Sequence, residues 1–251
     1  MLKKFCLGLF LVLLASSAFA FTNVYWLRGT DVKTTIEGEE NFFMSSSFPN
    51  SSSTKTEVSI KTVEGEGEIA RWYSVSFLQD YVLDGNVFVW VNNLKTSSPS
   101  NQFRFGLHAF DFSNNESEKI IESEWQTFPL SNEFIASISS PYILHSGKRL
   151  KLLLEYNSST SNSDIGLVLD EGNSLSQSTW NVSSGQSFDI FGVDSTAGLL
   201  LEFCSPSGII CEKNEDCVQD DSIAQATCIN AGGCNSKCIF EECDTECILK
   251  A

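Results

Sequence analysis

The stretch QFRFGLHAF, residues 102–110, alternates apolar and polar side chains along its length. Successive side chains of a β-strand point to opposite faces, so the apolar residues share one face and the polar residues share the other. The two sets are Phe103, Phe105, Leu107 and Ala109 against Arg104 and His108. RLKLLLEY, residues 149–156, repeats the pattern with Leu150, Leu152 and Leu154 against Lys151 and Glu155. Both stretches therefore predict antiparallel strands with one buried face.

Similar strand-like patterns occur before and after these two stretches. Short apolar or alternating runs, separated by Ser, Asn, Gly and Pro clusters, predict further strands over residues 24–29, 56–63, 70–77, 86–94, 164–170 and 197–203. Val87 to Val91 is apolar on both faces, which predicts a central strand covered on both sides. KIIESEWQTFPL, residues 119–130, also favours a strand, because its β-branched start and Pro129 oppose a helix.

No part of this region keeps a helical apolar period for more than about two turns. Strands at this spacing predict an all-β fold in which two antiparallel sheets pack face to face, as a jelly-roll sandwich over residues 21–203. We expect the first and last strands, near Tyr25 and Leu200, to be neighbours that close the domain.

The first twenty residues, MLKKFCLGLFLVLLASSAFA, carry two lysines, an apolar core and a small-residue cleavage site. This order predicts a signal peptide over residues 1–20, a mature chain that starts at Phe21, and a secreted or cell-surface location. The alternative is a retained membrane anchor, although the apolar run is shorter than the ~20 residues that span a bilayer. We expect no membrane span in the mature chain.

The chain is strongly acidic, with 16 basic and 32 acidic residues and a formal net charge of -16. Loss of Lys3 and Lys4 with the signal leaves 14 basic residues and a net charge of -18. Such a charge repels phosphate backbones and anionic lipid surfaces, so nucleic acid is excluded as an expected partner.

Cysteines concentrate at the C-terminal end, where eight of the nine fall within residues 204–251. This acidic segment is too short to build a core of its own and is expected to depend on crosslinks. In an exported chain an even number of cysteines predicts disulfides, here four, with every connectivity open. They are Cys204, Cys211, Cys217, Cys228, Cys234, Cys238, Cys243 and Cys247. A zinc site built from the last four is the alternative, which export and the absence of C-x-x-C pairs disfavour.

ARWYSVSFLQDYVLDGNVFVWVNN (residues 70–93) and ILHSGKRLKLLLEYNSSTSNSDIGLVLDEGNSLSQSTW (residues 143–180) resemble exported galactose-binding-like jelly-roll modules. These include the C-terminal domain of X-Pro dipeptidyl-peptidase-type hydrolases and carbohydrate-binding modules. The shared features are an Arg-Trp pair before a strand, a turn with Gly85, and a Gly turn before a Leu-rich strand. CEKNEDC and CINAGGCNSKC are similar to cysteine-rich segments of archaeal surface proteins. The resemblance implies a β-sandwich that binds sugars or supports a neighbouring catalytic domain.

Two tryptophans are candidate sugar-stacking platforms, because an exposed indole face packs well on the apolar face of a sugar ring. Trp180 follows a polar loop and is the first choice, and Trp125 is the second. Trp72 and Trp90 lie in strand centres and are expected in the core.

No catalytic residue is expected. The only histidines, His108 and His145, lie near no recognisable nucleophile motif, and G-x-S-x-G and H-E-x-x-H are both missing. We expect no cofactor. The acidic loops at 111–118 and 216–221 are candidates for a structural calcium ion, with a solvated charged loop as the alternative.

Four N-x-S/T sequons, at Asn50, Asn115, Asn157 and Asn181, are candidate glycosylation sites in surface segments. Together these features predict a non-enzymatic secreted or cell-surface module that binds carbohydrate or surface glycan, with an accessory role beside a hydrolase left open. The alternative is a structural cell-envelope or extracellular matrix component that assembles with other envelope proteins through its cysteine-rich tail.

Overall fold

The computed structural model describes residues 21–29, 34–36, 39–45, 56–91, 94–127, 133–169, 177–181, 187–191, 197–217 and 224–242. The predicted signal peptide lies outside these ranges. The first strand begins at Phe21, the predicted start of the mature chain.

Within the described ranges the regular structure is β-strand apart from short 3-10 turns at η2 (Pro206–Gly208) and η3 (Asn214–Asp216). The strands are β1 (Phe21–Arg28), β2 (Thr34–Ile36), β3 (Glu39–Ser45), β4 (Thr56–Lys61), β5 (Gly65–Tyr73), β6 (Tyr81–Val91), β7 (Leu94–Thr96), β8 (Gln102–Asp111), β9 (Glu116–Glu122), β10 (Gln126–Thr127), β11 (Glu133–Leu144), β12 (Arg149–Ser158), β13 (Asp164–Leu169), β14 (Gln177–Asn181), β15 (Ser187–Phe191), β16 (Ala197–Cys204), β17 (Ala224–Ile229) and β18 (Lys237–Glu242).

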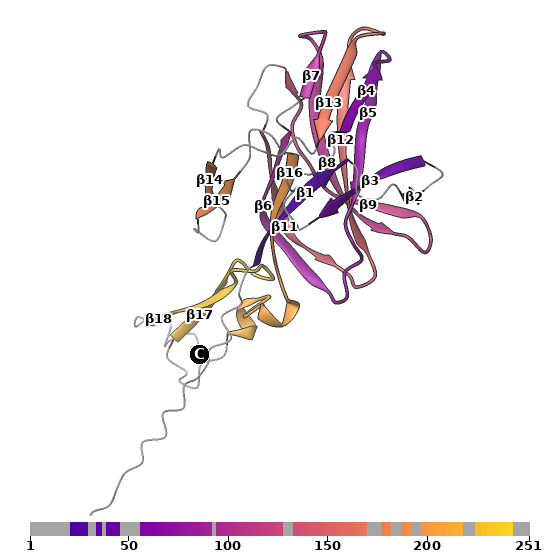
Figure 1. The fold of residues 1–251 in the computed structure, drawn as a ribbon. Coiled ribbons are helices and arrows are strands. Elements are labelled where there is room, and N and C mark those ends of the chain that lie inside the picture. Colours follow the sequence, from indigo (N-terminus) through magenta and orange to yellow (C-terminus); the bar gives the residue numbers. More distant parts are fainter. Residues whose placement is uncertain are drawn as a thin grey trace, which may run out of the picture.

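The main sheet runs in the order β10-β8-β12-β5-β3-β1-β16-β6-β11, with β2 paired to β3 and β9 paired to β8. The β3–β5 pair is parallel, and the other described pairs are antiparallel. The sheet curls until its two ends approach each other (Figure 1), and the Tyr142 hydroxyl of β11 donates a hydrogen bond of 2.7 Å to Glu118 of β9. The fold is thus a sandwich that approaches a closed barrel.

The interior is filled from both halves of this curled sheet. The edge of Phe105 on β8 meets Phe134 on β11, with ring centroids 6.5 Å apart. The predicted inward residues of β8 and β12 are all buried, which confirms the alternation: Phe103, Phe105, Leu107, Ala109, Leu150, Leu152 and Leu154. Tyr25 pairs with Leu199 and Val24 with Leu200, so the first and last strands of the sandwich are neighbours as predicted.

Strand β6 is covered on both faces, as its sequence predicts. Residues 87–91 are all buried, and the Phe88 and Trp90 side chains join Trp26 and Leu200 in a second apolar cluster on the face away from the main core. The Trp26 and Trp90 rings meet edge to face at 5.6 Å. Trp72 and Trp90 are fully buried, which confirms their prediction as core residues.

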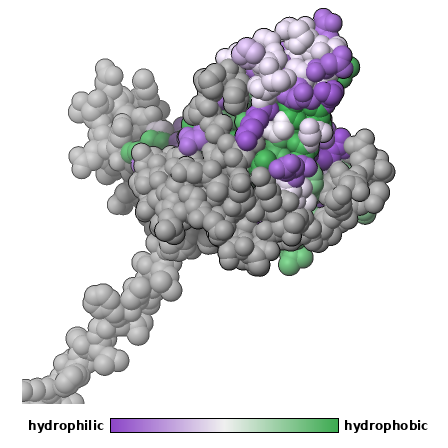
Figure 2. Space-filling view, turned by 45° about the horizontal axis from the view of Figure 1, so that its top comes forward, coloured by the Kyte–Doolittle hydropathy of each residue, from purple (hydrophilic) through white to green (hydrophobic). Residues whose placement is uncertain are grey.

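A smaller sheet, in the order β4-β13-β7, forms the end of the sandwich drawn uppermost in Figure 1. Buried polar side chains bind this sheet to the main one: the Ser158 hydroxyl donates to Asn101 at 2.7 Å, and the Asn101 amide donates to Ser163 at 3.0 Å. The Thr62 and Ser163 hydroxyls are 2.7 Å apart. Figure 2, in which this end is turned forward, shows mainly hydrophilic and near-neutral colours over it.

Two details of the prediction are wrong. Gly85 is not in a turn; it lies inside β6 with φ of 80° and pairs with Ile138, where the register of β11 shifts. The twelve-residue strand β11 was not predicted, because its SISSPY stretch reads as a polar break. A Gly turn at Gly147, with φ of 85°, does precede β12 as predicted.

The C-terminal appendage contains the hairpin β17–β18 and is fixed to the sandwich at the end of β16. Cys204 is bonded to Cys234, the Cys234 amide donates to Asp84 at 3.1 Å, and both sulfurs lie in a buried cluster with Val82. The all-β sandwich with a small disulfide-rich appendage is therefore confirmed, while the domain boundary at residue 203 stays a prediction. None of the described residues belongs to a helix of the length and hydropathy required to cross a membrane.

A substitution at Gly198 tests the packing around Trp90. It pairs with Trp26 on one side and Trp90 on the other, and a Cβ at this position would overlap the Trp90 ring. We expect Gly198→Ala to destabilise the protein by about 1–3 kcal/mol, as overpacking usually does. Denaturant unfolding monitored by tryptophan fluorescence measures the change.

Gly166→Ala on β13 is the matched control, since a Cβ there meets nothing within 4 Å. We expect its effect to stay within about 0.5 kcal/mol. Equal effects of the two substitutions would contradict the packing of Trp90 against Gly198.

Candidate functional site

Four side chains contact the guanidinium of Arg104 on the outer face of the sheet. Together with Arg104 they form what we call the Arg104 cluster: Arg104, Glu66, Glu122, Trp125 and Glu155. The alternation of β8 turns Arg104 outward, and the β8–β12 register places it opposite Glu155. Arg104 Nε lies 2.9 Å from Glu155 Oε2, and its terminal nitrogens lie 3.2 Å from Glu66 and 3.7 Å from Glu122.

Trp125 is held against this guanidinium. The Arg104 Cζ lies 4.2 Å from the centroid of the indole, a cation–π contact over one ring face. The segment between β9 and β10 is anchored by Ser123, whose amide donates to the Phe105 carbonyl at 2.9 Å and whose hydroxyl accepts from the Phe105 amide at 3.1 Å. The indole is thus fixed in orientation and partly exposed.

The cluster carries more negative than positive charge. Lys119 Nζ is 3.0 Å from Glu122, and its hydrogen bond, with Arg104 adding to it, lowers the pKa of the Glu122 carboxyl. Glu66 and Glu155 contact Arg104 as well, so three carboxylates face this guanidinium. Their oxygens are hydrogen-bond acceptors around the guanidinium that holds the indole, and polyhydroxylated ligands bind through such acceptors together with an aromatic face.

His108 and Lys151 lie beside the cluster on the same face. The Lys151 ammonium is 5.8 Å from the Tyr73 ring centroid and 5.5 Å from that of Phe110, and these rings explain why a predicted outward lysine is buried. Burial, followed by the charges of Lys151 and Lys119, lowers the pKa of His108. Ser117 Oγ is 3.3 Å from His108 Nδ1. That contact is longer than the ~2.6–3.2 Å typical of a paired nucleophile and base, and among the described residues no carboxylate hydrogen-bonds the ring.

The lowered pKa of His108 has a consequence for stability. Unfolding returns the group to its ordinary value of 6.5, so the unfolded chain takes up a proton more readily than the folded chain. The folding stability linked to this lowered pKa is fully present above pH 6.5 and is lost as the pH falls toward the pKa of His108 in the folded chain. We expect the midpoint of denaturant unfolding to be lower at pH 5 than at pH 8. The variant His108→Gln should lose part of this pH dependence. The same pH dependence in the variant and in the parent protein would contradict the role of His108.

The first-choice platform, Trp180, lies in strand β14 opposite Phe188 of β15, and not directly after a loop as predicted. Its side chain is outside the described residues, so of the two predicted platforms only Trp125 has a described environment. The sequence predicted Trp125 without its partners. Arg104 and Glu155 were recognised as outward-facing, but their pairing depends on the register of β8 against β12, which the sequence does not state.

The acidic loops have local roles in the described structure. Asp111 accepts hydrogen bonds from the Ser113 amide at 2.9 Å and from its hydroxyl at 2.6 Å, within the β8–β9 turn. Asp216 accepts from the Glu212 amide at 2.8 Å and the Lys213 amide at 3.0 Å. Residues 218–221 lie outside the described ranges. Among the residues that are described, no set of three carboxylates converges as a calcium site would require.

The disulfides confirm the predicted chemistry for six of the eight cysteines. The bonds are Cys204–Cys234, Cys211–Cys228 and Cys217–Cys238. The alternative zinc set is wrong in the described part, because Cys234 and Cys238 are bonded to different upstream partners. Cys243 and Cys247 lie outside the described residues.

Two of the four sequons have described side chains. Asn115 is exposed in the β8–β9 turn with φ of 59°, whereas Asn157 is half-buried on β12, with β5 paired on one side and β8 on the other. Asn181 ends β14, with its side chain outside the described residues, and Asn50 lies outside them altogether.

The exposed position of Asn115 and the half-buried position of Asn157 predict that, of these two, only Asn115 carries a glycan when the protein is made in a eukaryotic secretory host. We expect Asn115→Gln to remove one glycan from the secreted protein, because a turn tip is open to the bulky group, and Asn157→Gln to leave the mass of the attached glycans unchanged. Intact-mass spectrometry of each variant checks both. A glycan on Asn157 in the folded protein would contradict the paired position of that residue.

Taken together, the fold and this face define a β-sandwich module with a disulfide-rich appendage and a charged aromatic cluster on one sheet. No protein-family model matches the chain, and no curated protein matches its sequence. Among solved structures, the chain is similar to that of the infectious bursal disease virus Gt strain, with 7% identity, a TM-score of 0.27, and coverage of 75% of this chain and 38% of that chain.

A second similar structure is the infectious bursal disease virus VP2 subviral particle, with 11% identity, a TM-score of 0.26, and coverage of 61% of this chain and 35% of that chain. The chain therefore spans little more than a third of the length of these viral chains. At such TM-scores the likeness carries no conclusion about function.

Proposed function

We propose that this protein is an exported, non-catalytic, galactose-binding-like module that binds carbohydrate through the Arg104 cluster. The observation that carries the proposal is the Trp125 indole, held at 4.2 Å by the Arg104 guanidinium, which three carboxylates also contact. In this arrangement a sugar ring stacks on the indole face turned away from Arg104.

The physical support is preorganisation. The cation–π contact and the ion pairs fix the indole and the acceptors before a ligand arrives, which lowers the entropy cost of binding. Glu66, Glu122 and Glu155 each engage Arg104 through Oε2, so a second oxygen of each carboxylate is outside the described ion pairs. Their negative charge favours neutral or amino sugars over anionic polysaccharides.

The alternative, a structural envelope or matrix component that assembles through its tail, ranks second. All three described disulfides lie within the chain, and Cys204–Cys234 fixes the appendage to its own sandwich. The described cysteines are therefore not available to crosslink one chain to another. Deletion after Phe203 would change the oligomer size of such a component.

A glycan array probed with the purified chain tests the proposal. We expect Trp125→Ala to weaken binding about tenfold or more, in line with the ~1.4 kcal/mol that a stacked aromatic contact provides. Trp125→Phe should retain part of the affinity, because it keeps an aromatic face.

Phe112→Ala is the matched control, since Phe112 is an exposed aromatic of the β8–β9 turn, 59% exposed and outside the Arg104 cluster. Unchanged binding by Trp125→Ala, or loss of binding only in Trp180→Ala, would refute the Arg104 cluster as the site.

A further inference from the structure

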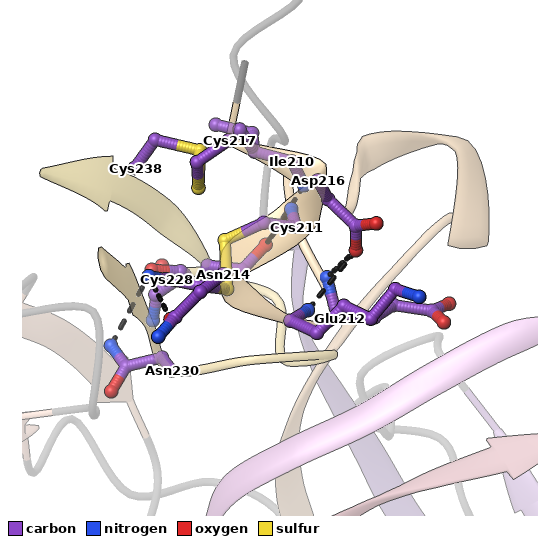
Figure 3. Close-up of a disulfide and its surroundings, with 12 residues drawn as sticks. Ile210, Cys211, Glu212, Asn214, Asp216, Cys217, Cys228, Asn230 and Cys238 are labelled. Carbon is purple, nitrogen blue, oxygen red and sulfur yellow. Dashed lines mark hydrogen bonds between the residues drawn. A yellow bond between two sulfur atoms is a disulfide. The ribbon is translucent and has the colours of Figure 1, made fainter. Parts of the chain in front are cut away.

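Four cysteines of the appendage come together from the 211–217 loop and from strands β17 and β18, and we call them the four-cysteine cluster: Cys211, Cys217, Cys228 and Cys238. Cys228 and Cys238 are directly opposite each other on β17 and β18, yet each is bonded to a cysteine of the 211–217 loop that lies over the hairpin. Figure 3 shows the two bonds side by side.

Three of the four sulfur atoms of this cluster are as close as ligands of one metal ion. The Sγ atoms of Cys211, Cys217 and Cys228 all lie within 4.8 Å of one another, and Cys238 Sγ is covalently attached to that of Cys217. Four thiolates around a zinc ion at ~2.3 Å stand about 3.8 Å apart.

Hydrogen bonds hold the loop over the hairpin independently of the sulfur bonds. The Asn214 side chain accepts from the Cys228 amide at 2.8 Å, and the Cys211 carbonyl accepts from the Gly232 amide at 2.9 Å. Asp216 shapes the loop from within by accepting from the Glu212 and Lys213 amides, a contact visible in Figure 3. We expect these contacts to keep the loop over the hairpin after the disulfides open.

The three bonds also differ in access to a reductant. Cys204 and Cys234 are both buried, whereas each bond of the cluster joins a buried cysteine, Cys211 or Cys217, to a half-buried one, Cys228 or Cys238. Thiol–disulfide exchange requires access of the attacking thiolate to a sulfur atom. The two bonds of the four-cysteine cluster therefore open first, and the Cys204–Cys234 bond keeps the appendage attached to the sandwich.

We propose that the four-cysteine cluster is a redox-gated binding site for a thiophilic divalent cation of the Zn²⁺ class, crosslinked when oxidised and a tetrathiolate ligand set when reduced. Each disulfide accepts two electrons and two protons from one dithiol reductant, which becomes a disulfide itself. The metal ion then displaces protons from the four thiols as it binds. Soft thiolate ligands favour Zn²⁺ over Mg²⁺ or Ca²⁺.

The test uses the full chain with Cys243→Ser and Cys247→Ser, so that these two residues do not contribute thiols. After treatment with a dithiol and its removal under anaerobic conditions, Zn²⁺ is titrated by calorimetry and Co²⁺ by its tetrahedral thiolate absorption. We expect one metal ion per chain in the reduced protein and none in the oxidised protein, with no uptake of Mg²⁺.

Variants locate the ligands. Cys211→Ser with Cys228→Ser should abolish one-to-one uptake, and Cys217→Ser with Cys238→Ser should do the same, whereas Cys204→Ser with Cys234→Ser should retain it. Far-ultraviolet circular dichroism verifies that the sandwich stays folded in each. The proposal is overturned by equal uptake in the oxidised protein, by no uptake in the reduced protein, or by uptake that survives loss of either cysteine pair of the cluster.

Discussion

The register between β8 and β12 is the constraint on which the rest of the structure depends. It sets Leu152 opposite Leu107 and Leu154 opposite Phe105 on the inner face, and Glu155 opposite Arg104 on the outer face. A slip by one residue would exchange the two faces and bring a guanidinium into the apolar interior. The same pairing therefore decides both the core and the Arg104 cluster, so the candidate site is as well defined as the hydrophobic packing beneath it.

The sandwich and the appendage are stabilised by different interactions. The sandwich buries large aliphatic and aromatic side chains from strands far apart in the sequence, and it contains no disulfide within residues 21–203 because that segment has no cysteine. The appendage has little apolar surface to bury and relies on covalent bonds between nearby segments. Asp84 of β6 links the sandwich to the appendage, because its carboxylate accepts a hydrogen bond from the Cys234 amide.

The sequence predicted those features that depend on local pattern. The alternation in residues 102–110 and 149–156 identified the inner and outer faces, and the apolar run at 87–91 identified the central strand. Strand β11 was missed because Ser139, Ser140 and Pro141 interrupt the pattern, while its pairing with β6 compensates through a register shift. The other members of the Arg104 cluster around Trp125 were not predictable, because they come from the four strands β5, β8, β9 and β12 and become neighbours only through the order of the sheet. Likewise, the spacing of the cysteines left the connectivity open, and the crossing of the 211–217 loop over the β17–β18 hairpin determines it.

The bond between Cys204 and Cys234 joins the appendage to a strand that has hydrogen-bonded neighbours on both sides, β1 and β6. Tension applied through the appendage is thereby delivered along the axis of β16, roughly perpendicular to its hydrogen bonds. The hydrogen bonds of β16 to β1 and to β6 then resist the force together, in shear, and they do not break one pair at a time. The sandwich is for this reason expected to resist a force applied at the C-terminal end of β16.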